Sequence, residues 1–549
     1  MKKIVSLLLM ATITLGIAVG CSNNNGGGTS GNDDNGPEIV IYTGGSSEFA
    51  WSEGSEEQEV VDYIRAKYKQ DTGNSIRFKV HFLGQSMKTK LGTDISGKEP
   101  ADVAVSHTRG GEGIDDFVTN NDYVYDISDL LDDYGENVKK YISGNPMNAL
   151  TTADGDVIGI PSVISPYKFG ILVRKDLMEK AGYTAEESDT SKIYVNTIEK
   201  FENMCAEMLK QNPSLKNAIT GASWDLEKVL VLGPYTDSGY FTYTTRGEGD
   251  DLSVLPGFAT EEYTQVLQKE YEWASADYME QYFGITDKRT ITSVQANATL
   301  IEQGESNFIA GSTAVFVQDP TVTHLIKVAR KCKAQNPEAE FTLLGPLTAD
   351  DSSTKKGFMR NTEATFAACF LKGSKNAKAL MQFMNWVYES EENYNLCRLG
   401  IEGKHWVNNG DGTYSYPAGK ESYLTKSPYS GILTLVENQK ISNLTYKEYT
   451  ADEKSWIEKA SNPDWYIKND LIDYMLTLNA GTFSVYESYR SGVYSHVQTV
   501  WAGKRDPLAE IEGKGVEYTE YYRNNFLKGA KTSLEALTAD YKIMKKGRS

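Results

Sequence analysis

Short apolar runs alternate with helical segments near the start of the chain, and this alternation limits the fold more than any other feature. Three runs are typical of strands: 38–42 (EIVIY), 76–82 and 100–105 (PADVAV). The segments between them, 56–70 and 89–95, have helical spacing of apolar residues. Strand, helix, strand, helix, strand in this order predicts βαβ units and a parallel sheet in an α/β protein.

Ligands of such open sheets bind in the crevice beyond the carboxyl ends of the strands. We therefore expect the loops after Tyr42, Phe82 and Val105 to carry function. Later segments continue the α/β pattern. Further strands are expected at 156–161, 168–174, 312–317, 342–344 and 364–371, with helices at 198–209 and 377–388.

Length and charge set outer limits. The chain has 549 residues, which is too long for one hydrophobic core and predicts at least two lobes. Its formal net charge of −19 disfavours nucleic acid or an anionic membrane surface as a partner.

The first residues have the pattern of an export signal. Lys2 and Lys3 precede an apolar run, small residues follow at 18–20, and Cys21 comes next. This arrangement resembles the bacterial lipobox and implies a signal peptide at 1–20 and lipidation (palmitate) of Cys21. Residues 21–36 are polar and glycine-rich, which is typical of a flexible tether. We expect a protein anchored by lipid on the extracytoplasmic face of the cell membrane.

Four stretches resemble the family 1 extracellular solute-binding proteins, and specifically large Gram-positive lipoproteins of the lipoprotein LplA type. They are 100–105 (PADVAV), 155–161 (GDVIGIP) with 170–182 (GILVRKDLMEKAG), 308–317 (FIAGSTAVFV), and 374–386 leading into 400–406 (GIEGKHW). The resemblance implies a periplasmic-binding-protein type II fold, in which two α/β lobes are joined by a hinge with a ligand cleft between them. It places lobe one at 37–165 plus 307–360 and lobe two at 166–306 plus 361–549.

Enzyme motifs match poorly. Residues 92–98 (GTDISGK) have phosphate-loop spacing, but Glu99 replaces the required serine or threonine and a strand follows. Residues 352–355 (SSTK) match S-x-x-K in a polar loop. The dispersed histidines and the internal cysteines Cys205, Cys332, Cys369 and Cys397 lack metal-ligand spacing. We expect no catalytic residue, metal or cofactor, although paired glycosidase carboxylates from distant positions stay open.

Sugars present apolar faces, which aromatic rings cover, and hydroxyl groups, which polar side chains bind. The candidate substrate-binding residues of the first lobe are Trp51, Gln85, His107, Arg109, Gln318 and Asp319. Those of the second lobe and hinge are Tyr167, Trp224, Tyr240, Arg360, His405 and Trp406.

The family resemblance and the many aromatic residues together favour a monomeric, non-enzymatic receptor for an oligosaccharide. Hinge closure would trap the ligand, and the partners would be the permease subunits of an ABC importer. Two alternatives stay open: the same fold binding a peptide or other polar nutrient, and a surface glycosidase.

Overall fold

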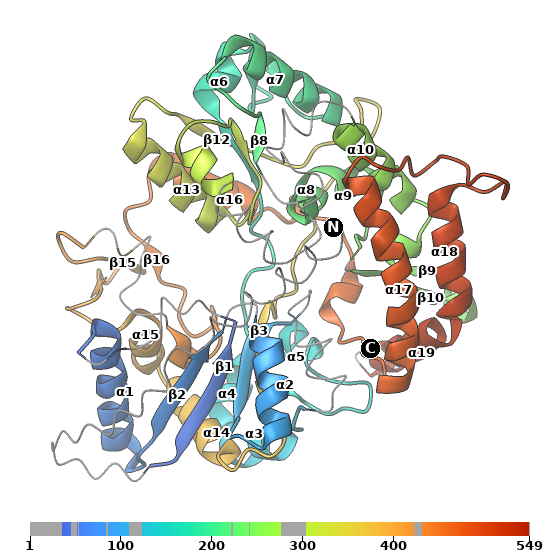
Figure 1. The fold of residues 1–549 in the computed structure, drawn as a ribbon. Helices are drawn as coiled ribbons and strands as arrows, with labels where there is room; N and C mark the ends of the chain where they lie inside the picture. The colour runs from blue at the N-terminus through green and yellow to red at the C-terminus, as the bar shows by residue number, and fades with distance from the viewer. Residues whose placement is uncertain are drawn as a thin grey trace, which may run out of the picture.

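The computed structural model describes residues 36–44, 52, 54–83, 86–108, 123–220, 223–240, 242–275, 304–420, 423 and 431–547. Two α/β lobes are joined by several chain segments, and a group of helices from the C-terminal part of the chain packs beside them (Figure 1). Within these described ranges, no helix is both long and apolar enough to cross a membrane. Cys205, Cys332, Cys369 and Cys397 are buried free thiols.

The first lobe is built on a five-stranded sheet in the order β2-β1-β3-β13-β4. Its strands are β1 (Glu38–Thr43), β2 (Arg77–Phe82), β3 (Val103–His107), β4 (Gly159–Pro161) and β13 (Phe366–Phe370). β1 pairs in parallel with β2 and β3, whereas β13 runs antiparallel to β3 and β4. The parallel βαβ start that the sequence predicted is therefore confirmed.

Helices cover both faces of this sheet: α1 (Glu56–Thr72), α2 (Met87–Gly97), α3 (Ser128–Tyr134), α4 (Glu136–Ile142), α5 (Asn145–Asn148), α14 (Ala377–Val387) and α15 (Glu391–Leu399). Alternate residues of β1 point to opposite faces, so Ile39 and Ile41 join one core while Val40 and Tyr42 join the other. α1 begins where the Ser55 hydroxyl accepts a hydrogen bond from the Gln58 N–H, and it ends at Gly73, whose φ of 75° is left-handed.

The second lobe contains a four-stranded sheet in the order β12-β5-β11-β8. Its strands are β5 (Ile171–Arg174), β8 (Ile219–Thr220), β11 (Val315–Phe316) and β12 (Phe341–Leu344). The surrounding helices are α6 (Lys175–Lys180), α7 (Ile198–Gln211), α8 (Ser223–Leu226), the π-helical turn η4 (Glu227–Val231), α9 (Leu232–Tyr235), α10 (Tyr263–Ser275), α13 (Val322–Gln335) and α16 (Ala451–Ala460).

Three C-terminal helices extend the core of the second lobe. They are α17 (Ala480–Trp501), α18 (Tyr518–Gly529) and α19 (Lys531–Lys546), and they pack with α10 and the hairpin of β9 (Tyr243–Arg246) and β10 (Ser253–Pro256). The remaining short strands are β6 (Tyr183–Thr184), β7 (Ile193–Tyr194), β14 (Val407–Asn408), β15 (Thr413–Ser415) and β16 (Thr445–Tyr446). The 3-10 turns are η5 (Gly249–Asp251), η6 (Gly257–Ala259), η9 (Ile432–Thr434), η10 (Pro463–Trp465) and η11 (Asp470–Asp473).

Sheet membership corrects the expected lobe boundaries. Residues 307–360 were expected in lobe one, but they supply β11 and β12 to the sheet of the second lobe. Residues 361–549 were expected in lobe two, but they supply β13, α14 and α15 to the first lobe before the chain returns. These strands were assigned to the wrong lobe because a short apolar strand does not itself indicate the sheet that it joins.

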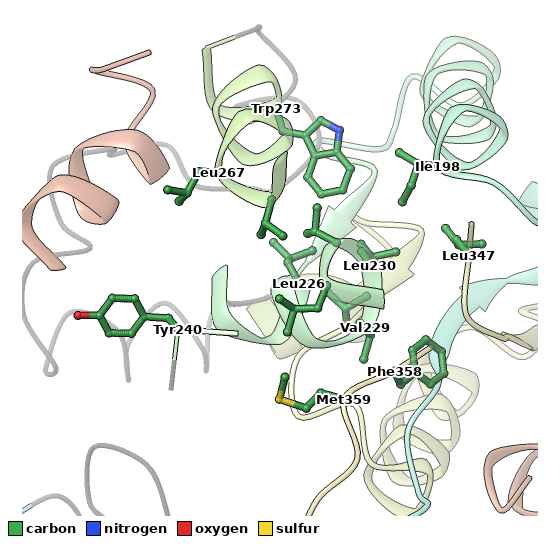
Figure 2. Packing of buried hydrophobic residues seen from close by; sticks show 14 of the residues in the cluster. Ile198, Leu226, Val229, Leu230, Tyr240, Leu267, Trp273, Leu347, Phe358 and Met359 are labelled. Carbon is green, nitrogen blue, oxygen red and sulfur yellow. The ribbon is translucent and has the colours of Figure 1, made fainter. Parts of the chain in front are cut away.

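Segments 162–170, 345–365 and 461–475 run between the lobes and are bonded to one another. The N–H of Phe358 donates to the carbonyl of Trp465 (2.6 Å), and the N–H of Ile467 donates to the carbonyl of Phe358 (2.9 Å). Figure 2 shows Phe358 and Met359 packed beside Val229 of η4 in the large core of the second lobe. The guanidinium of Arg360 also forms two hydrogen bonds with the Asp473 carboxylate, at 3.1 and 2.6 Å. These bonds join the connecting segments to one another between the two lobes.

Candidate functional site

His107 lies at the carboxyl end of β3, where the parallel part of the first sheet ends. Its ring lies 4.2 Å, centroid to centroid, from the ring of Phe366, its register partner on β13. Phe366 is 37% exposed, so an apolar ring face stays accessible beside the histidine. Burial, followed by the charges of Lys168 and Lys228, lowers the pKa of His107. Both lysines belong to elements outside the sheet of His107, so their charges act on it from the connecting segment and the second lobe.

Asp319 and Asp225 meet in the second lobe. The N–H of Asp319, just after β11, donates to the Asp225 carboxylate (3.2 Å). The Lys228 ammonium lies 3.8 Å from the same carboxylate. Burial raises the pKa of Asp225 to about 6, although the nearby Lys228 acts in the opposite direction. Asp319 itself has a φ of 38°, a left-handed conformation that aspartate tolerates better than most residues.

Lys168 stands on the first connecting segment, between these two groups. Its carbonyl accepts a hydrogen bond from the Val322 N–H (2.7 Å), and the Gly170 N–H donates to the Pro320 carbonyl (3.0 Å). This pairing holds Lys168 near Asp319. Burial lowers the pKa of the Lys168 ammonium, while Asp319 and Glu437 act in the opposite direction.

These side chains form what we call the interlobe charged cluster, which consists of His107, Lys168, Asp225, Lys228, Asp319 and Glu437. It combines hydrogen-bond donors with carboxylate acceptors, and Phe366 places an aromatic face at its edge. Hydroxyl groups donate to carboxylates and accept from ammonium groups, so this arrangement suits a ligand rich in hydroxyls.

The structure places two sequence-predicted residues, His107 and Asp319, in this cluster. Gln318 is buried beside Asp319, and Tyr167 precedes Lys168 with its ring 5.0 Å from that of Tyr466. Sequence reasoning missed Lys168, Asp225, Lys228, Glu437 and Phe366. Asp225 and Lys168 directly follow two residues that were predicted, so the loops were found but not every side chain in them.

Four other predicted residues have partners within the fold. Tyr240 is 2% exposed, lies beneath the Arg490 guanidinium, and points away from Phe358 in Figure 2. His405 is fully buried and accepts a hydrogen bond from the Ile401 N–H (3.0 Å), while the Trp406 indole donates to the Gly400 carbonyl (2.8 Å). Arg360 pairs with Asp473. Ligand contact by these four residues stays a prediction.

The predictions for Cys21, Trp51, Gln85 and Arg109 fall outside the described residues. The same holds for the side chain of Trp224. Among the described residues, no group of three His, Cys, Asp or Glu side chains is arranged to hold a metal ion.

Glu227, which directly precedes Lys228 of the cluster, is one of two buried glutamates that influence each other's charge. Glu227 begins η4, directly after α8, and accepts hydrogen bonds from the Tyr240 N–H (3.0 Å) and the Tyr263 hydroxyl (3.3 Å). Glu270 of α10 accepts a hydrogen bond from the Trp501 indole (2.7 Å). Burial raises the pKa of Glu227 to about 7. Burial and the charge of Glu227 also raise the pKa of Glu270.

Two solved structures at low sequence identity share the fold over nearly the whole chain. The N-glycan transport solute-binding protein NgtS of Streptococcus pneumoniae is 14% identical, with 93% of this chain and 100% of that chain covered and a TM-score of 0.61. The alginate-binding protein AlgQ2, solved without calcium ion, is 13% identical, with 92% and 98% covered and a TM-score of 0.64.

A third such structure is a solute-binding protein of Bifidobacterium longum infantis that binds human milk oligosaccharides (HMO). It is 13% identical, with 93% and 99% of the two chains covered and a TM-score of 0.60. The sequence profile described as "Bacterial extracellular solute-binding protein" matches residues 51–394. A search of curated proteins finds no match. The expected type II periplasmic-binding-protein fold is therefore confirmed.

We predict that Glu227→Gln removes a pH-dependent loss of stability. Because the folded-state pKa is raised, the native state favours the protonated acid. Its contribution to stability is complete below about pH 4.5 and is lost as the pH rises through about 7. Above pH 8 the variant should exceed the wild type by about 3 kcal/mol in unfolding free energy, measured by urea titration across pH. The exposed Glu261→Gln should leave the pH profile unchanged, and a Glu227→Gln profile parallel to the wild type would refute this assignment.

Proposed function

Because the chain belongs to the bacterial extracellular solute-binding proteins, we propose that it binds an oligosaccharide between its lobes and delivers it to an ABC permease. The observation that carries this proposal is the interlobe charged cluster, which draws His107 from one lobe, Asp225, Lys228 and Asp319 from the other, and Lys168 from the connecting segment. A ligand held there contacts both lobes at once, which is the condition for closure around it.

The choice of an oligosaccharide rests on two supports. The cluster offers hydroxyl-binding groups of both charges beside the exposed ring of Phe366. Structural neighbours are described as proteins that transport or bind N-glycans, alginate and human milk oligosaccharides. In this proposal the protein acts as a monomer, binds its sugar without changing it chemically, and uses no cofactor.

Thermal unfolding against a glycan panel tests the ligand class. The panel contains N-glycan fragments, alginate oligomers and human milk oligosaccharides, with peptides as a second arm. A ligand at a hundred times its dissociation constant should add about 2.7 kcal/mol to the unfolding free energy, which gives a clear shift of the melting temperature. Chromatography should then recover the sugar intact. Stabilisation by peptides alone would refute the oligosaccharide proposal, and a consumed sugar would indicate a glycosidase.

The charged cluster makes a separate prediction at Lys168. Lys168→Met keeps the length of the side chain and removes its charge, so the affinity for the stabilising glycan should fall roughly 10- to 100-fold in calorimetry. Stability of the ligand-free protein should stay equal or rise, because burial disfavours the charged ammonium. The matched control is Lys210→Met on α7, whose side chain is 75% exposed and whose loss should leave affinity unchanged. Wild-type affinity in Lys168→Met would remove this lysine from the site.

We propose further that Cys21 carries a lipid anchor and that residues 21–36 act as its tether. The support is the order of charged start, apolar run, small residues and cysteine. Cys21→Ser should move the protein from the membrane fraction into the soluble fraction and abolish labelling by palmitate. Retention of Cys21→Ser in the washed membrane fraction would contradict the anchor.

A further inference from the structure

A segment that leaves the first lobe after α15 forms a small sheet in the order β14-β15-β16. Figure 1 shows β15 and β16 between the two lobes, with α15 below them and α13 and α16 above. We call residues 400–420, 423 and 431–449 the strap.

The strap is attached to the first lobe through η9, which packs in the core of that lobe, and through α1. The Tyr423 hydroxyl donates a hydrogen bond to the Glu56 carboxylate (3.0 Å), and the Lys420 ammonium lies 3.7 Å from that carboxylate. Lys404 forms an ion pair with Glu59, one helical turn from Glu56.

The other attachment of the strap is to the second lobe, through Arg330 of α13. The Arg330 guanidinium donates to the carbonyl of Glu448 in the strap (2.9 Å). It is oriented by both carboxylate oxygens of Glu453 on α16, at 2.7 and 2.6 Å. The same guanidinium lies 5.6 Å from the ring centroid of Tyr446 and 5.8 Å from that of Tyr449. The rings of Tyr446 and Tyr449 are therefore held in place by Arg330 of the second lobe.

Five tyrosines connect these two attachments, and we call them the tyrosine row: Tyr414, Tyr416, Tyr423, Tyr446 and Tyr449. Ring centroids along the row are 5.5 to 5.8 Å apart. Tyr423 and Tyr446 are buried, whereas Tyr414 and Tyr416 are partly exposed. Tyr414 lies on β15 and Tyr416 directly follows the strand. Because they are two residues apart in extended chain, their side chains share one face.

Hydroxyl groups distinguish this row from an ordinary small core. Burial raises the pKa of Tyr416, and burial likewise raises that of Tyr449 to about 12. Burying a phenol hydroxyl costs free energy unless the hydroxyl finds a partner, as the Tyr446 hydroxyl does in the Glu448 carboxylate (3.3 Å). Rings with a hydroxyl tip suit a surface where one part is apolar and another contacts polar groups.

Glu437 joins the tyrosine row to the interlobe charged cluster. Its charge acts both on the Tyr414 hydroxyl and on Lys168. Its carbonyl accepts a hydrogen bond from the Val163 N–H (2.9 Å), on the same connecting segment as Lys168. The strap is thus bonded to the connecting segment that carries Lys168, and the row reaches α1 at its Tyr423 end.

We propose that Tyr414 and Tyr416 form an outer subsite for sugar rings of an extended oligosaccharide whose other end is held at the interlobe charged cluster. This inference rests on the proposed function and adds to it a preference for longer chains. Each partly exposed ring offers a face to the C–H side of one sugar unit, and the neighbouring hydroxyls bind its rim. A ligand that occupies both places gains the contacts of the row, whereas a ligand held at the cluster alone does not.

Calorimetry with short and long probes tests this subsite. The probes are the N-glycan fragments Man1GlcNAc and Man5GlcNAc, and alginate oligomers of increasing length. In whichever series the wild type binds, Tyr416→Ala should raise the dissociation constant of the long members about tenfold. This corresponds to the roughly 1.4 kcal/mol of one aromatic contact. Binding of the short members should not change, and Tyr416→Phe should retain most of the affinity because it keeps the ring.

Two controls separate folding from binding. Tyr489→Ala removes a tyrosine that is 42% exposed on α17. It should change the affinity neither for the short probes nor for the long ones. If Tyr416→Ala unfolds, Tyr416→Leu keeps apolar volume, still lacks the flat ring, and should show the same length-dependent loss. Equal losses for short and long probes, or no loss for either, would overturn the outer subsite while leaving the proposed function intact. Failure of the wild type to bind any glycan would overturn both.

Discussion

Backbone pairing between the connecting segments determines where the cluster residues of the second lobe lie. Phe358 exchanges hydrogen bonds with the 465–467 segment, and the N–H of the next residue, Met359, donates to the carbonyl of Lys228 (3.1 Å). The hinge thus bonds directly to the helical turn that carries the cluster. Gly233 permits this approach, because a Cβ at that position would lie 1.9 Å from the carbonyl oxygen of Gly357. A change in the path of the hinge would therefore move Lys228 as well.

The cluster differs from the rest of an acidic protein. The whole chain has a formal net charge of −19, yet Lys168 and Lys228 converge where His107 also lies. The carboxylates of Asp225, Asp319 and Glu437 balance them. A site with both charges close together binds hydroxyl groups through donors and acceptors, without selecting strongly for an ion.

Local sequence patterns predicted most individual elements, but not the sheet to which each one belongs. The strands at 38–42, 100–105 and 364–371 and the helix at 198–209 appear within a few residues of their expected places, because apolar spacing depends on burial of one face. The lobe assignment was wrong for 307–360 and for the part of 361–549 that carries β13, α14 and α15, because strand pairing over hundreds of residues is decided by tertiary packing. His107 and Asp319 were identified from loop position, whereas Lys168 lacked any local signal of burial.

The two attachments of the strap differ in strength, and this difference has a mechanical consequence. Its bonds to α1 include ion pairs between side chains that are more than 40% exposed, and such pairs contribute little in water. Its bonds to α13 are the hydrogen bond from Arg330 to the Glu448 carbonyl and the contacts of the same guanidinium with two aromatic rings. Leu433, Leu435 and Val436 of the strap are buried in the core of the first lobe, so the strap belongs to that lobe. Separation of the lobes would therefore break its bonds to Arg330 and leave the tyrosine row on the first lobe.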